Sequence, residues 1–113
     1  MKSCVFLVNK DLLYLFKEAK QECPNDVSAI SKNGIDGSEI LLIIIKITTT
    51  SLPIILKIVK DLKNKSQDPQ MLSIKNMVIE LQINNRQIFK LDIKQETFNN
   101  IQNKIIEINN KDE

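Results

Sequence analysis

"ILLIIIKITTTSLPIILKIV", residues 40–59, is the most apolar stretch of this 113-residue chain, and its interpretation decides the fold. A stretch of roughly 20 apolar residues is long enough for a helix that crosses a membrane. Lys46 lies within its first half, however, and residues 48–51 form a polar Thr-Thr-Thr-Ser break that a helix in lipid would have to bury. We therefore interpret the stretch as a strand followed by a helix, both buried in a water-soluble domain.

The two halves of this stretch have different local signals. Residues 39–47 are dominated by β-branched isoleucine and have a length suited to a central strand buried on both faces. Ser51 can cap the helix that follows, and Pro53 suits its first turn, where an amide proton has no partner within the helix. Apolar residues then recur at helical spacing, at Leu52, Ile55, Ile58, Val59 and Leu62.

This helix carries more apolar surface than a single buried stripe requires. Ile54, Leu56 and Ile58 make it apolar over more than half of its circumference, so we expect it to be covered on two sides. It should lie either deep in the protein or at a subunit interface. The candidate interface residues are Ile54, Leu56 and Ile58, with Lys57 and Lys60 beside them.

Four more segments are predicted on either side of the central stretch. Residues 3–8 predict a buried first strand, and the apolar spacing between residues 10 and 23 predicts an amphipathic helix that stops at Pro24. Residues 24–38 contain both glycines, Gly34 and Gly37, and predict a long connection with room for a short strand. The pattern of Phe98, Ile101, Ile105 and Ile108 predicts a closing helix that begins near Thr97.

A hairpin is expected between residues 77 and 93. Apolar residues alternate with polar ones in both halves, which is the period of strands with one buried face. If the two apolar sets share that face, Leu81 must pair with Phe89, and the odd loop Asn84-Asn85-Arg86 follows. A two-residue turn would invert the second strand.

The expected fold class is α+β, an α/β sandwich with the order β-α-β-α-β-β-α. About four strands should form a mixed sheet with helices packed on it. The length of the chain predicts a single domain over residues 1–109, followed by a frayed polar tail at residues 110–113.

The composition excludes several kinds of chemistry. The chain has no histidine, which rules out serine hydrolase triads and imidazole acid–base catalysis. The net charge of +2 and a single arginine, Arg86, do not favour nucleic-acid binding, and Asp61 interrupts the lysines at 57, 60, 63 and 65. No cofactor or metal is indicated. Cys4 and Cys23 are expected to be reduced packing residues of a cytoplasmic protein.

Carboxylates are the remaining candidates for chemistry. Asp11 follows the first strand by three residues, where small metal-dependent nucleases of ferredoxin-like shape carry an acidic residue for magnesium. It also suits the first turn of a helix, where the dipole favours a negative charge. The pairs Asp36 with Glu39 and Asp92 with Glu96 are interpreted as solvated acids.

Three segments together resemble a known family. They are "ILLIIIKITTTSLPIILKIVKDLK" (residues 40–63), "MVIELQINNRQIFKLD" (residues 77–92) and "TFNNIQNKIIEI" (residues 97–108). With their order along the chain, they are similar to the small bacterial effector-associated constant components of conflict systems. The family commonly has an Asp-Gly type turn where this chain has Asn84-Asn85-Arg86, and many relatives have an alanine-rich second helix where this chain has isoleucine and lysine.

The resemblance implies a non-enzymatic adaptor that couples an effector, often a protease-like one, to other components of a defence system. Its partners would be that effector or a second copy of the chain, and no catalytic residues are carried over. Two other hypotheses stay open. Residues 40–59 could insert into a membrane as part of a membrane-active effector, or Asp11 could serve a small metal-dependent nuclease.

Overall fold

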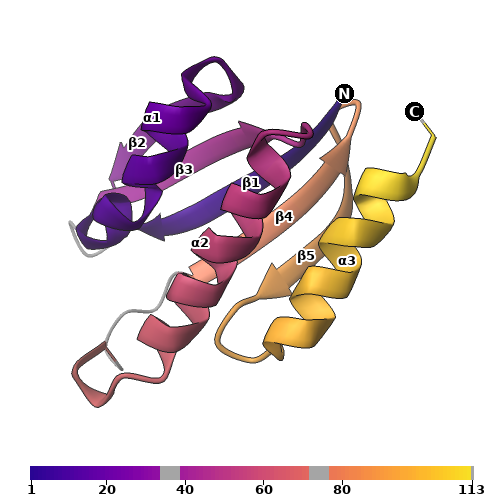
Figure 1. The fold of residues 1–113 in the computed structure, drawn as a ribbon. Helices are drawn as coiled ribbons and strands as arrows, with labels where there is room; N and C mark the ends of the chain where they lie inside the picture. The colour runs from indigo at the N-terminus through magenta and orange to yellow at the C-terminus, as the bar shows by residue number, and fades with distance from the viewer. Residues whose placement is uncertain (34–38, 72–76, 113) are drawn as a thin grey trace.

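A computed structural model describes residues 1–33, 39–71 and 77–112, and it shows a five-stranded sheet with helices on one of its faces (Figure 1). The strands are β1 (Lys2–Asn9), β2 (Val27–Asn33), β3 (Glu39–Lys46), β4 (Met77–Ile83) and β5 (Arg86–Asp92). The α-helices are α1 (Lys17–Glu22), α2 (Ser51–Ser66) and α3 (Phe98–Asn110). Three 3-10 segments accompany them, η1 (Lys10–Phe16), η2 (Pro24–Asp26) and η3 (Pro69–Met71).

The α+β class is confirmed, but the predicted four-stranded mixed sheet is wrong. The strand order is β2-β3-β1-β4-β5, and every neighbouring pair is antiparallel. The additional strand is β2, which occupies much of the segment predicted as a long connection. Its apolar residues are few because β2 is an edge strand that has a neighbour on one side only, so the sequence pattern there is weak.

The first helical segment also differs from the prediction. Instead of one α-helix over residues 10–23, the chain forms the 3-10 segment η1 and then the short helix α1. The predicted inward residues nevertheless face the core, with Leu12, Phe16 and Ala19 fully buried and Cys23 5% exposed. Periodicity therefore identified the buried residues but not the type of helix, because a three-residue spacing places side chains on nearly the same side of a 3-10 helix and of an α-helix.

The β4–β5 hairpin has the predicted pairing and a different turn. Leu81 pairs with Phe89 as expected, but the loop has two residues, Asn84 and Asn85, rather than three. Both have positive φ, 51° and 66°, as a type I′ turn requires. A bulge between Leu81 and Gln82 then adds one residue to β5, which restores the parity that a two-residue turn would invert.

The start of α2 is fixed by a reciprocal pair of hydroxyl contacts. The Ser51 amide donates to Thr48 Oγ1 over 3.0 Å, and the Thr48 amide donates to Ser51 Oγ over 2.9 Å. The arrangement resembles a capping box in which serine replaces the usual glutamate. Thr48 Oγ1 also donates to Asp26 Oδ2 over 3.0 Å, so the predicted cap at Ser51 is one half of a network that joins η2 to α2.

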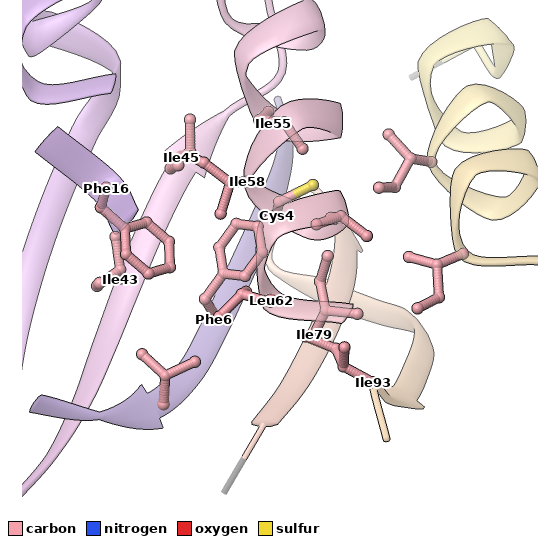
Figure 2. Packing of buried hydrophobic residues seen from close by; sticks show 14 of the residues in the cluster. Cys4, Phe6, Phe16, Ile43, Ile45, Ile55, Ile58, Leu62, Ile79 and Ile93 are labelled. Carbon is pink, nitrogen blue, oxygen red and sulfur yellow. The ribbon is translucent and has the colours of Figure 1, made fainter. Parts of the chain in front are cut away.

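One hydrophobic core lies between the sheet and the helices (Figure 2). The rings of Phe6 and Phe16 meet edge to face with centroids 5.1 Å apart, and Ile55 and Leu62 of α2 are fully buried nearby. The predicted inward residues of α3 are confirmed: Ile101, Ile105 and Ile108 are fully buried, and the predicted Thr97 start accepts from the Asn100 amide. Among the described residues, no helix combines the length and apolarity needed to span a bilayer.

Candidate interaction surface

The structure places the predicted interface residues of α2 in three different environments. Ile58 is 2% exposed and belongs to the core. Ile54 and Leu56 are half-buried and pack against the core from its margin. Only Lys57 and Lys60 are exposed. The five residues therefore do not form one apolar surface in this fold.

Other helices of the same chain lie on both flanks of α2 (Figure 1). Lys57 lies one helical turn after Ile54 on the same flank of α2, and its Nζ is 2.7 Å from Glu18 Oε2 of α1. This hydrogen-bonded ion pair raises the pKa of Lys57 above its usual value. On the flank of Leu56, Lys63 Nζ donates to the carbonyl oxygens of residues 93 and 94, just before α3. The surplus apolar surface of α2 is thus used within the fold.

A second apolar surface lies on the sheet face opposite the helices. Successive side chains of a strand point to opposite faces. Cys4, Phe6 and Val8 of β1 enter the core, so Val5 and Leu7 point to the other face. We call this other face the open face, because none of the described helices lies on it. The strand register places seven aliphatic residues there: Val5, Leu7, Ile30, Ile40, Leu42, Ile44 and Val78.

These seven residues are separate from the core that the helices cover. None of them belongs to the core cluster or to the partly buried residues packed against it. Val5 on the central strand β1 is 4% exposed, whereas Ile30 on the edge strand β2 is 51% exposed. The other five are half-buried. Contiguous apolar surface of this kind on a folded chain typically marks an interaction site.

The register arranges the open face in rows that run across the strands. One row joins Ile30, Leu42, Leu7, Val78 and Asp92. The next row joins Ser28, Ile44, Val5, Glu80 and Lys90. Six of the seven aliphatic residues therefore lie on β2, β3 and β1, whereas β4 and β5 contribute Val78 and the charged residues Glu80, Lys90 and Asp92.

Charges of both signs lie on the open face. Lys46 and Lys90 are exposed, and so is Asp92, while Glu80 is half-buried and is the cross-strand partner of Lys90. Asp92 Oδ1 accepts from the Lys94 amide over 2.9 Å, which holds this carboxylate at the end of β5. A face on which acids lie among the lysines presents no continuous positive patch to a polyanion such as nucleic acid.

The sequence predicted that part of this surface is apolar. Residues 40–45 are apolar without interruption, and we predicted a strand buried on both faces. The core side is confirmed by Ile43 and Ile45, both fully buried, whereas Leu42 and Ile44 on the open face stay half-buried. The sequence did not show on which face of the sheet the helices lie. All of the described helices pack on the core face.

The structure does not gather the chemistry-bearing residues into one site. Asp11 is exposed in the first turn of η1, and no group of three or more potential metal ligands occurs among the described residues. Burial raises the pKa of the Cys4 thiol far above its usual range and also raises that of Cys23. Both are free thiols within the core, as the sequence predicted, and both are held in the unreactive protonated form.

A shallow hollow lies beside β2. It is lined by Lys20, Pro24, Val27 and Ala29 and has a volume of about 180 Å³. Sites for small molecules typically measure about 300–1,000 Å³ and contain several convergent polar groups. This hollow has one ionisable side chain, Lys20, so it does not resemble a catalytic pocket.

Of the two predicted acid pairs, only Asp92 with Glu96 lies wholly within the described residues. Asp36 and the glycines Gly34 and Gly37 lie outside the described residues. Glu96 accepts from the Asn100 side-chain amide over 2.5 Å, and Asp92 is exposed, so this pair serves the turn before α3. Neither carboxylate faces a concavity that the structure describes.

Comparison of the chain with protein-family models, with curated proteins and with solved structures gives no significant match.

Proposed function

We propose that this protein is a non-enzymatic interaction module whose binding surface is the open face of the sheet. The observation that carries this proposal is the set of seven aliphatic side chains that lie outside the core cluster. A sheet that packs helices on one face usually presents polar residues to water on the other. Here the strands β1 and β3 are apolar on both faces.

The setting of this module is proposed from the resemblance of the sequence to effector-associated constant components. On that basis the module couples an effector, often a protease-like one, to other components of a bacterial conflict or defence system. Docking through the open face, rather than through Ile54 and Leu56, is favoured because α2 is already flanked by α1 and α3.

Co-expression with the products of neighbouring genes tests this function. Leu42→Glu places a charge at the centre of the open face, and Ile106→Glu places the same charge on the outer side of α3, where Ile106 is 36% exposed. We expect Leu42→Glu to lose the complexes that the wild-type chain forms, and Ile106→Glu to keep them. Complexes that survive Leu42→Glu unchanged would contradict the proposal.

A further inference from the structure

We propose that the open face binds the open face of a second copy of this chain, in a two-fold symmetric dimer of face-to-face sheets. This inference rests on the proposed function, because it names the first partner of the same surface. It is argued from the area of the face, the arrangement of its aliphatic rows and the positions of its charges.

The area of the open face is sufficient for a stable pair. Five strands about 4.8 Å apart, each about seven residues long with a rise of 3.3 Å per residue, cover roughly 550 Å². Two such faces would bury about 1,100 Å² in total, which meets the roughly 1,000 Å² expected of a specific interface. Face-to-face packing of sheets about 10 Å apart is also the usual way in which two aliphatic sheet surfaces are buried.

The aliphatic rows are complementary to themselves. Consider a two-fold axis that runs across the strands, between the row of Leu7 and the row of Val5. This axis places Leu7 over Val5 of the second copy and Leu42 over Ile44 of the second copy. In a two-fold interface each contact occurs twice, so Val5, Leu7, Leu42 and Ile44 of both copies are covered. The same axis places Val78 over Glu80 of the second copy.

The same axis pairs opposite charges at the β5 edge. Asp92 lies in the row of Leu7, and Lys90 lies in the row of Val5. The axis therefore places Asp92 of each copy over Lys90 of the other. Glu80 keeps Lys90 as its neighbour within its own sheet, so its carboxylate is not left without a positive charge beside it. This adjacent placement of an acid and a base is what a self-complementary surface requires.

Sedimentation equilibrium on the full chain tests the dimer. We expect the wild-type protein to be a dimer at micromolar concentration. Leu42→Glu should weaken dimerisation by about 100-fold or more, because two buried carboxylates would face an aliphatic surface. Ile106→Glu is the matched control and should leave the dimer intact. If Leu42→Glu fails to fold, Ile30→Glu replaces it, since Ile30 is already 51% exposed.

A charge exchange tests the orientation of the two copies. Asp92→Lys places two lysines over each other twice per dimer, and we expect dimerisation to weaken about tenfold at low salt. Adding Lys90→Asp to this variant restores opposite charges between the two copies and should recover most of the affinity lost in Asp92→Lys, although it removes the positive neighbour of Glu80 within the sheet. Glu22→Lys changes the charge equally on α1, on the helix side of the sheet, and should have little effect.

Three results would overturn this inference. They are a monomeric wild-type chain, a dimer insensitive to Leu42→Glu or its replacement Ile30→Glu, and a double charge exchange that fails to restore an affinity lost in Asp92→Lys. A monomer whose open-face variants still lose their complexes with other proteins would overturn the dimer while leaving the proposed function in place. The two proposals can therefore fail separately.

Discussion

Deletion of Ile88 should be tolerated, whereas deletion of Lys90, two residues further along the same strand, should unfold the protein. Gln82 pairs with Gln87 and Leu81 pairs with Phe89, so Ile88 is the extra residue of the bulge. Its removal leaves Phe89 opposite Leu81 and keeps the same side chains in the core. Because Ile88 is 38% exposed, the free energy of unfolding should change by only about 1 kcal/mol.

With the bulge retained at Ile88, deletion of Lys90 shifts every later residue of β5 to the opposite face. Leu91, now 7% exposed, would leave the core, which costs about 1.5–3 kcal/mol. Asp92 would take its place opposite Ile79, and an unpaired carboxylate in an apolar core costs several kcal/mol more. The total of roughly 5 kcal/mol or more is comparable with the whole stability of a typical domain, about 5–15 kcal/mol.

Urea denaturation followed by circular dichroism measures both variants. The expected result is a cooperative transition for the Ile88 deletion, close to that of the wild type, and little or no folded baseline for the Lys90 deletion. Equal damage from the two deletions would show that the bulge does not set the register of β5, and the explanation of the hairpin would then be wrong.

Three further predictions concern stability and are measured by the same denaturation assay. Asn85→Ala should lower the free energy of unfolding by about 1 kcal/mol because φ is positive at this position, while Asn85→Gly should not; equal effects would refute the turn assignment. Thr48→Val should cost about 1–2 kcal/mol by removing its contacts at the start of α2, and an equal loss in Thr50→Val, whose side chain makes no cap, would contradict this. Cys4 and Cys23 have raised pKa values in the folded state, so their contribution to the free energy of unfolding is full below the ordinary thiol pKa of 9.0 and is lost as pH rises above it. Cys4→Val should therefore reduce the fall in the free energy of unfolding between about pH 8 and pH 10, and an unchanged fall would contradict this prediction.

The sequence predicted the core side of most elements, because that information is local. The alternation in β4 and β5 required the pairing of Leu81 with Phe89, and this pairing is confirmed. The sequence did not show which loop produces this pairing, because a three-residue loop and a two-residue turn followed by a bulge both place Phe89 opposite Leu81. Asn84 and Asn85, which both tolerate positive φ, were the available hint toward the shorter turn.

The interaction surface was harder to predict because it depends on where distant elements pack. The apolar excess of α2 was noticed, but the neighbours that use it, α1 and α3, are set by tertiary structure. Conversely, residues 40–45 were predicted to be buried on both faces, and only the arrangement of all the helices on one side leaves Leu42 and Ile44 half-buried. Strand β2 was expected only as a short strand within a long connection and was left out of the predicted sheet, because an edge strand has few apolar residues.

The central claim, that another protein surface covers the open face, is tested most directly by methyl NMR with a soluble paramagnetic probe. The sample is the wild-type chain at a concentration where sedimentation shows it to be assembled or, if it stays monomeric, its complex with a co-purifying partner. We predict that the methyl signals of Leu42 and Ile44 are protected nearly as well as those of the buried Ile79, while exposed Ile106 is strongly broadened. Broadening of Leu42 and Ile44 to the same extent as Ile106 would contradict the account.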